Sequence, residues 1–344
     1  MVGIEDVARL AGVSTATVSR ALSGKEHVSE RARDKVKQAA AELGYVASSS
    51  AYTLATGRHR NIGVVLPFVD RWFFSVALEA IETVLIERGY DLTLYNLGES
   101  EGQRSKIFND FLLRKRVDGV LCVSVKPLES ELAALNRTGK PVFGIGGQIK
   151  GIRTLSINDR SAAYLATEHL IGLGHSRIAN IGGLPPTEMH FMQPSLRHEG
   201  YEQALLDNNL SVRPTWFVPA DYTISGAYHA AKQVLGDPRN APTAIVCASD
   251  EMGFGAIMAA KDLGLRVPED VSVIGLDNHD MSDFFSLTTI NQDVRGQGRH
   301  AAEQLLAVLE SQDPEMPTNI EENTEWNVEL LIRHSTARPA AGNR

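Results

Sequence analysis

The sequence predicts an α/β protein with an all-helical N-terminal head and a core of two doubly wound parallel-sheet subdomains. Residues 4–22 carry apolar residues at helical spacing, with one interruption at Gly12. From residue 61 onward, short apolar runs typical of buried strands alternate with amphipathic helical segments. The chain has 344 residues, which exceeds the usual size of a single domain.

The first 22 residues predict a helix-turn-helix. Their apolar residues recur at helical spacing: Ile4, Val7, Ala8, Ala11, Val13, Val18 and Leu22. Gly12 suits the left-handed position that ends a helix, and Ser14 stands where an N-cap oxygen is wanted. The second helix is short and polar and ends its outward face in Arg20, so it fits a DNA major groove. The pattern alone leaves open a plain helical hairpin inside a larger core.

A third helix is expected between Ser29, which can cap it, and Gly44, which ends it. Its inner stripe consists of Ala32, Val36, Ala39, Ala40 and Leu43. Three helices of this size make a small core of their own. Residues 46–57 are rich in Ser and Thr, which is typical of a flexible linker.

The rest of the chain alternates predicted strands with predicted helices. The strands are expected at 62–66, 92–95, 119–123, 142–145, 178–181, 244–247 and 271–275. The helices are expected near 74–88, 101–114, 162–173, 196–208, 223–235 and 251–263. This alternation favours parallel sheets, and the number of units is enough for two.

Several sequence blocks together resemble a known family. They are IEDVARLAGVSTATVSRAL at 4–22, Val28-Ser29-Glu30, Leu43-Gly44-Tyr45, Asn61-Ile62-Gly63, Ser249-Asp250-Glu251-Met252, Val273-Ile274-Gly275-Leu276-Asp277, Leu287-Thr288-Thr289-Ile290 and Arg333-His334-Ser335-Thr336. In this order they resemble the lactose-repressor and galactose-repressor (LacI/GalR) family of bacterial transcription regulators. The resemblance covers nearly the whole chain and disfavours the hairpin alternative.

The resemblance implies a periplasmic-binding-protein-like core and a division of the chain. It places a helix-turn-helix DNA-binding domain at 1–46, a hinge or linker at 47–60, an effector-binding and dimerisation core at 61–338 and a tail at 339–344. Subdomain one would hold about 61–157 plus 291–321, and subdomain two about 158–290 plus 322–338. In the family, the hinge becomes a short helix only when the dimer sits on its operator.

The charge is uneven along the chain. The net charge is −8, from 34 Lys and Arg against 42 Asp and Glu. Residues 1–60 hold nine basic and six acidic residues, so the head carries +3 and the remainder −11. A cationic head on an acidic body suits a protein that presents only its head to phosphates.

Two cysteines and the N-terminus bear on the compartment. Cys122 and Cys247 lie in apolar runs, which favours a reducing compartment without disulfides. The N-terminus lacks a signal-peptide pattern, and no apolar run is long enough to span a membrane. We therefore expect a cytoplasmic protein.

Enzyme motifs fail or are missing. Gly144-Ile145-Gly146 begins a dinucleotide-binding pattern, but the position of its third glycine is Ile149. The sequence has no P-loop, GxSxG elbow, HExxH helix or CxxC pair, and its ten His residues are scattered. We expect no catalytic activity, no cofactor and no metal.

The resemblance implies a set of DNA contacts. Thr15, Ala16 and Arg20 match base-reading positions, and Arg20 can offer a bidentate fork to guanine. Ser14, Thr17 and Ser29 match phosphate-contacting positions, although helix capping alone explains such small residues as well. Leu54 matches a leucine that the family wedges into the minor groove.

The resemblance also implies an effector pocket between the subdomains. The matching residues are Phe73, Phe74, Asp159, Arg197, Tyr222, Ser249 and Asp277. Carboxylates and a guanidinium can engage the vicinal hydroxyls of a sugar, while aromatic rings cover its apolar face. Phe73 and Phe74 are equally well explained as core residues. The loop at 184–195 leaves the register before Arg197 open.

We therefore expect a transcription regulator, a repressor that binds a palindromic double-stranded DNA operator as a homodimer. A small-molecule effector, a carbohydrate or a derivative of one, would switch it allosterically. No leucine heptads follow residue 336, which favours a dimer over a tetramer. The alternatives are a periplasmic-type solute-binding protein, opposed by the helix-turn-helix, and an α/β enzyme, opposed by the failed glycine motif.

Overall fold

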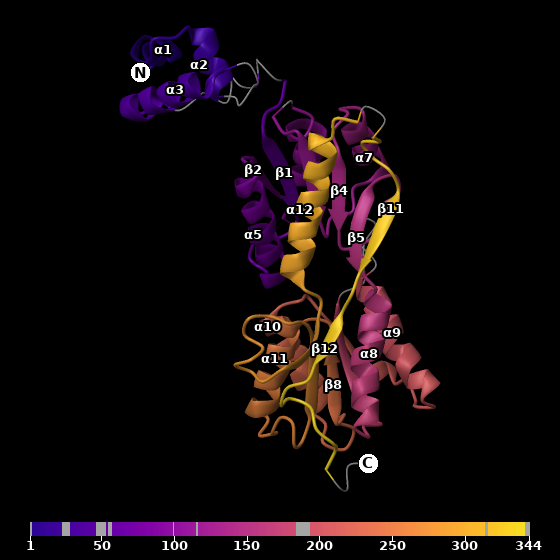
Figure 1. Cartoon of the computed structure of the whole chain (residues 1–344). Coiled ribbons are helices and arrows are strands. Elements are labelled where there is room, and N and C mark those ends of the chain that lie inside the picture. The colour runs from indigo at the N-terminus through magenta and orange to yellow at the C-terminus, as the bar shows by residue number, and fades with distance from the viewer. Residues whose placement is uncertain are drawn as a thin grey trace. The chain divides into compact units, whose positions relative to one another are not determined.

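The computed structural model describes residues 2–22, 28–45, 53, 57–98, 100–114, 116–183, 193–313 and 316–340. The chain divides into two compact units, Met1–Arg60 and Asn61–Arg344 (Figure 1). The predicted Leu54 wedge lies outside the described residues. None of the helices in the described ranges has the length and apolar character needed to cross a bilayer.

The first unit contains the three helices that the sequence predicts. They are α1 (Ile4–Ala11), α2 (Thr15–Leu22) and α3 (Glu30–Leu43). Val7, Val18 and Val36, one from each helix, are completely buried at the centre of their shared core. Gly12 ends α1 in a left-handed conformation at φ 68°, which glycine adopts without the Cβ penalty. Because α2 starts three residues after Gly12, this turn sets the direction of the second helix.

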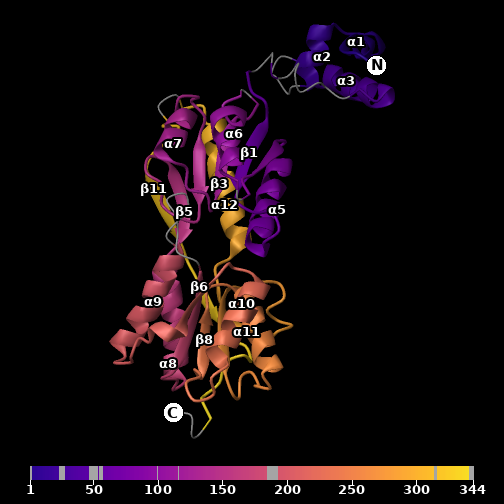
Figure 2. The ribbon, with the colours of Figure 1, turned by 180° about the vertical axis from the view of Figure 1, so that it is seen from behind.

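The second unit begins with a sheet whose strands are all parallel. Its order is β11-β5-β4-β3-β1-β2. The strands are β1 (Asn61–Leu66), β2 (Asp91–Asn96), β3 (Gly119–Val123), β4 (Val142–Ile145), β5 (Arg153–Ile157) and β11 (Glu322–Trp326). The helices are α5 (Trp72–Glu87), α6 (Glu101–Lys106), the π-helix η1 (Ile107–Phe111), α7 (Glu129–Asn136) and α12 (Val294–Glu310). Helices α5 and α12 cover one face, and η1 and α7 pack on the other (Figures 1 and 2).

A second sheet follows the same plan. Its order is β12-β10-β9-β8-β6-β7, and only β12 runs antiparallel to its neighbour. The strands are β6 (Ile178–Gly183), β7 (Phe217–Ala220), β8 (Ala244–Cys247), β9 (Ser272–Asp277), β10 (Thr288–Asn291) and β12 (Glu329–Leu331). The helices are α8 (Asp159–Gly172), α9 (Gln193–Asp207), the short η2 (Pro214–Trp216), α10 (Ile224–Leu235) and α11 (Asp250–Asp262).

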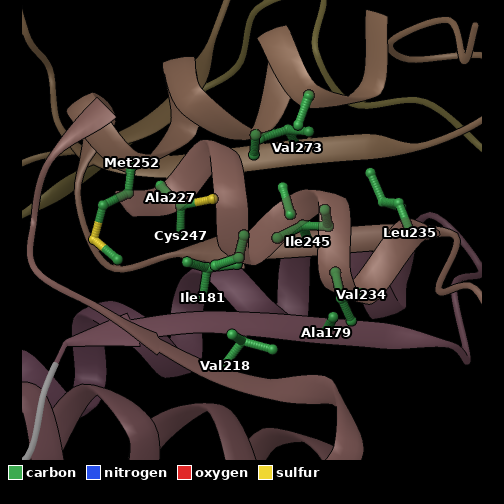
Figure 3. Packing of buried hydrophobic residues seen from close by; sticks show 14 of the residues in the cluster. Ala179, Ile181, Val218, Ala227, Val234, Leu235, Ile245, Cys247, Met252 and Val273 are labelled. Carbon is green, nitrogen blue, oxygen red and sulfur yellow. The ribbon is translucent and has the colours of Figure 1, made fainter. Parts of the chain in front are cut away.

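The second sheet is buried on both faces, as parallel sheets require. On one face, Ile181, Cys247 and Val273 of three neighbouring strands pack against Ala227 of α10 and Met252 of α11 (Figure 3). Helices α8 and α9 cover the other face. The near-continuous apolar strands that the sequence shows are therefore explained by burial on both sides.

The chain passes between the two sheets three times, and one expected boundary was wrong. Residues 322–326 were assigned to subdomain two, but they form β11, which pairs with β5 from Glu322↔Arg153 to Trp326↔Ile157. The return to the second sheet therefore comes after Trp326. Without β11, β5 would expose its backbone hydrogen-bonding groups at the sheet edge, and the polar β11 is itself suited to an edge position.

Candidate functional site

In the head, α2 presents the residues that were predicted to read bases. Thr15, Ala16 and Arg20 are all exposed. Ser14 is exposed and caps the helix, because its Oγ accepts the Thr17 backbone N–H at 3.1 Å. The Thr17 hydroxyl lies 2.9 Å from the same Oγ, so this half-buried side chain is tied to the cap.

Ser29 has the equivalent position in α3. Its Oγ accepts the Ala32 backbone N–H at 3.3 Å, and the residue is exposed. A capping hydroxyl uses a lone pair on its oxygen, so its hydrogen remains able to donate to a phosphate oxygen. Helix capping and phosphate contact are therefore compatible roles for Ser14 and Ser29.

In the core, the predicted effector residues come from segments near the carboxyl ends of strands. Asp159 begins α8 just after β5, Asp277 ends β9, and Tyr222 and Ser249 follow β7 and β8. Arg197 lies in the first turns of α9. Ligands of open parallel α/β sheets bind beyond the carboxyl ends of the strands, so this is the expected edge.

Arg197 and Asp159 form a largely buried ion pair, with 12% and 5% of their side chains exposed. The Arg197 Nε–H donates to Asp159 Oδ1 at 2.7 Å, and its Nη1–H donates to the Ala248 carbonyl at 2.5 Å. Burial raises the pKa of Asp159, although Arg197 opposes this shift. Burial lowers the pKa of Arg197, but the negative charge of Asp159 and its hydrogen bond to the guanidinium raise it, and the overall shift is upward. The guanidinium therefore stays charged.

Asp277 is buried in a strained turn. The Gln292 side-chain amide donates to Asp277 Oδ1 at 2.5 Å, and the Asp250 N–H lies 3.4 Å from Oδ2. Burial and then the neighbouring Asp250 raise the pKa of Asp277, while Arg197 lowers it. Asp277 and Asn278 have φ values of 141° and 59°, which side-chain-bearing residues rarely adopt. Such strain is concentrated at functional sites.

Asp250 is a buried carboxylate with a structural role. Its oxygens accept the hydroxyls of Thr289 and Ser282, each at 2.6 Å, and the His279 backbone N–H at 2.8 Å. Burial raises its pKa, and these hydrogen bonds oppose the shift. Asp250 therefore fixes the segment after β9 to the start of α11. A Cβ on Gly275 would lie 2.1 Å from Asp250 Oδ1, so only glycine fits beside this carboxylate.

The remaining predicted effector residues, which carry aromatic rings or a hydroxyl, differ in their surroundings. Tyr222 adopts φ 58°, and its ring covers Gly183 so closely that a Cβ there would lie 2.4 Å from Cε2. Phe73 and Phe74 meet edge to face at 5.3 Å and pack against the core of the first sheet. The Ser249 Oγ accepts the Met252 N–H at 3.3 Å and so caps α11.

The structure thus brings four of the seven predicted residues into one electrostatic group. Asp159, Arg197, Tyr222 and Asp277 each perturb the pKa of another member. Burial raises the pKa of Tyr222 to about 12, so its hydroxyl stays protonated. Phe73, Phe74 and Ser249 have packing or capping roles in their own elements.

Sequence reasoning missed the amides of this region. Gln292 holds Asp277, and the Gln193 amide donates at 2.5 Å to the Gly146 carbonyl, which follows β4 of the other sheet. A single glutamine in a loop or at the start of a helix has no pattern that separates it from an ordinary surface residue. Only the meeting of distant segments gives these two residues a role.

Comparison with known proteins agrees with this architecture. The family model described as bacterial regulatory proteins, lacI family, matches residues 3–48, and that of a periplasmic binding protein-like domain matches residues 167–336. The HTH-type transcriptional repressor PurR of Aliivibrio fischeri (strain ATCC 700601 / ES114) is 36% identical over 321 residues, covering 92% of this chain and 94% of its own. The PurR repressor of Vibrio vulnificus (strain CMCP6) is 33% identical over 346 residues, covering 98% and 99%.

Solved structures show the same likeness. A Lac repressor dimer bound to operator and the anti-inducer ONPF has a TM-score of 0.81 and 29% identity, with 98% of this chain and 99% of that chain covered. A complex of the transcriptional regulator CelR with cellobiose has a TM-score of 0.70 and 28% identity, with 97% and 100% covered. The chain belongs to the lacI family of bacterial regulatory proteins and is a DNA-binding transcriptional repressor with an effector-binding domain.

Proposed function

We propose that this repressor binds a palindromic operator as a homodimer and is switched by a sugar or sugar derivative held at Asp159, Arg197, Tyr222 and Asp277. The exposed face of α2 would read bases through Thr15, Ala16 and Arg20, and the Leu54 wedge would kink the centre of the operator.

The observation that carries the DNA-binding part is the surface of α2. Its predicted base-reading residues are exposed, while Val18 and Ala21 are buried in the head. A small helix with its apolar side used for packing and its polar side exposed can enter a major groove without losing its own core. The Lac repressor dimer bound to operator, which this chain resembles along almost its whole length, supports a dimer on DNA.

The observation that carries the effector part is the buried group around Arg197. Two buried carboxyls lie together with a partly buried guanidinium and phenol, and a hydrogen bond from a ligand to a buried polar group discriminates strongly between ligands. Vicinal hydroxyls both donate and accept, so they match a mixed set of this kind. The cellobiose complex of a similar regulator supports a carbohydrate.

A thermal-shift screen tests the effector. Sugars and sugar phosphates are added to the wild type and to Asp277→Ala, and a ligand at 100 times its Kd stabilises the fold by about 2.7 kcal/mol. We expect a sugar that raises the unfolding temperature of the wild type and not of Asp277→Ala. A ligand that stabilises both proteins equally would place its site elsewhere.

A DNA selection tests the other half. Wild-type protein is used to enrich duplexes from a random pool, and the enriched sequences are expected to be palindromic. Binding should weaken steeply with salt, because the head neutralises phosphates. Enrichment of no sequence, or of sequences without two-fold symmetry, would contradict dimeric operator binding.

A further inference from the structure

One contact joins the two sheets beside the predicted effector residues. Trp72, the first residue of α5, stacks on His279 with ring centroids 4.7 Å apart and an angle of 26° between the rings. Its Nε1–H donates to Asp280 Oδ2 at 3.1 Å. Helix α5 belongs to the first sheet, whereas His279 and Asp280 follow β9 of the second. We call Trp72, His279 and Asp280 the Trp72 clasp.

The second-sheet side of the clasp is held firmly. The His279 N–H donates to Asp250 Oδ2 at 2.8 Å, and the His279 Nδ1 accepts the Met281 N–H at 2.9 Å. The ring of Phe254 meets that of His279 edge to face at 5.2 Å. The His279 ring on which Trp72 stacks is therefore held in place by contacts within the second subdomain.

Charged groups from both sides surround the clasp. Arg295 of α12 pairs with Glu79 of α5 and lies 3.8 Å from Asp280. The carboxyl of Glu251 in α11 feels the positive charge of Arg71 and the backbone N–H of Trp72, both of which lower its pKa against the effect of burial. Arg71, just before α5, thus attracts a carboxyl of the second subdomain, while the neighbouring Asp70 opposes this attraction.

Only Asn278 separates Asp277 from His279 of the clasp, and the backbone is strained at both Asp277 and Asn278. Asp277 and Asn278 both have left-handed φ values, and His279 follows at once. Asp250 joins the two ends, because its N–H points to Asp277 Oδ2 and its own Oδ2 accepts the His279 N–H. Asp277 is therefore linked to the His279 backbone both along the chain and through Asp250.

We propose that the Trp72 clasp is the contact through which the state of Asp277 sets the arrangement of the two subdomains. A ligand shifts such an equilibrium only by interacting differently with its two states, and the clasp supplies a contact that can be present in one and absent in the other. The link to an effector rests on the proposed function, whereas the link from Asp277 to the clasp does not.

The test measures distances between the subdomains without DNA or effector. Ser130→Cys on α7 and Leu206→Cys on α9 are both exposed sites for spin labels, while Cys122 and Cys247 are buried and stay unlabelled. Labelled protein is diluted in unlabelled protein, so that double electron–electron resonance reports distances within one chain. Failure here would leave operator binding and effector binding untouched, which separates the two proposals.

The first comparison asks whether the clasp holds the subdomains. Trp72→Ala and Asp280→Ala, which remove the donor and the acceptor of the clasp, are expected to add a distance population that the wild type lacks. Trp72→Phe keeps a ring over His279 without the donor and covers the case in which alanine unfolds the protein. The matched control is Asp283→Ala, because Asp283 lies on the same segment but pairs with Arg333 of its own subdomain. Clasp variants with the wild-type distribution would overturn the proposal.

The second comparison asks whether Asp277 acts through the clasp. Asp277→Asn is expected to shift the distance distribution when Trp72 is present and to add no further shift in Trp72→Ala. Equal shifts in both backgrounds, or none in either, would show that Asp277 does not act through Trp72.

Discussion

At the scale of single residues, two buried carboxyls at one sheet edge have different roles. Asp250 receives two hydroxyls and a backbone N–H, so its hydrogen-bonding capacity is used within the fold. Asp277 receives one firm hydrogen bond, from Gln292, and a long one from Asp250. Because two adjacent carboxylates cannot easily both ionise in a buried site, the pair favours a proton on one of them. Asp277 is the member with capacity left for a ligand.

The raised pKa of Asp277 predicts a pH-dependent stability. The folded protein binds the proton of the Asp277 carboxyl more tightly than the unfolded chain does, in which an aspartate has a pKa of about 3.9. The protonated carboxyl therefore contributes its full stabilisation of the fold below the unfolded-state pKa. This contribution is lost as the pH rises through the higher folded-state pKa. The total loss is about 1.4 kcal/mol for each pH unit that separates the two pKa values. Asp277→Asn should lack this loss, so its stability relative to the wild type should rise with pH.

Urea unfolding at several pH values between roughly 4 and 8 measures the stability of Asp277→Asn relative to the wild type. The control is Asp283→Asn, because the side chain of Asp283 is 80% exposed and its ion pair lies at the surface. If the difference in unfolding free energy between the wild type and Asp277→Asn stays constant with pH, the folded-state pKa of Asp277 is not raised.

Arg20 carries the clearest residue-level prediction for DNA. Arg20→Ala should lose about 1–3 kcal/mol on the selected operator and relax the preference at one base pair per half-site. Arg20→Lys should not restore the operator affinity or the base preference, because an ammonium group cannot donate two parallel hydrogen bonds to guanine as a guanidinium can. The control is Arg9→Ala, an exposed arginine of α1. Equal losses on operator and random DNA, measured by fluorescence anisotropy, would show that Arg20 contacts only phosphate.

At the scale of elements, the head could be predicted from sequence because its signals are local. Gly12 and Gly44 end helices, and Ser14 and Ser29 begin them, at the positions where the sequence predicts these roles. Capping depends on a few neighbouring residues, so no knowledge of distant segments is needed.

The core was less predictable where an element depends on distant partners. Strand β11, with the sequence ENTEW, lacks an apolar run, and only its pairing with β5 makes it a strand of the first sheet. The π-helical turn η1 within the predicted helix at 101–114 also has no signal in the apolar spacing. At the site, the grouping of Asp159 with Arg197 followed from resemblance, but Gln292 and Trp72 emerged only from the fold.

The cap of α2 gives a prediction at this scale. Ser14→Ala removes the acceptor of the Thr17 N–H and should destabilise the helix by about 0.5–2 kcal/mol. Hydrogen exchange of the amides in residues 15–22 should quicken accordingly. The control is Ser19→Ala, an exposed serine within the same helix. Unchanged exchange in Ser14→Ala would show that the hydroxyl does not hold the helix start.

At the scale of the whole molecule, the two sheets meet at their carboxyl ends. Gln193, after β6, reaches Gly146 after β4, and His279, after β9, reaches Trp72 after β1. Contacts on two different strand pairs therefore join the two subdomains. Both contacts span the two subdomains, and a change in how subdomains are arranged is one of the ways in which allosteric proteins switch.

Assembly can be predicted at this scale as well. The chain should sediment as a dimer at micromolar concentrations, both with and without DNA. A dimer is expected because a symmetric dimer matches the two-fold symmetry of a palindromic site. The selected half-sites should lie about one helical turn apart, ~34–36 Å from centre to centre. A tetramer in sedimentation, or half-sites at a spacing unrelated to the helical repeat, would contradict a simple dimer.

The last prediction concerns the link between the effector and DNA. If Asp277 anchors the effector, Asp277→Ala leaves the partner groups of the ligand unmatched and should abolish effector binding. The ratio of operator affinities with and without effector should then fall to one. For an inducer, the variant should repress permanently, whereas for a co-repressor it should be permanently derepressed.

We expect induction, in which the effector releases DNA. Linkage is reciprocal, so the operator must then weaken effector binding to the wild type by the same factor by which the effector weakens operator binding. Calorimetry with the sugar found by thermal shift, in the presence and absence of operator, measures that factor directly. Normal effector affinity in a correctly folded Asp277→Ala protein would rule out the anchoring role, and equal affinities with and without operator would rule out the switch.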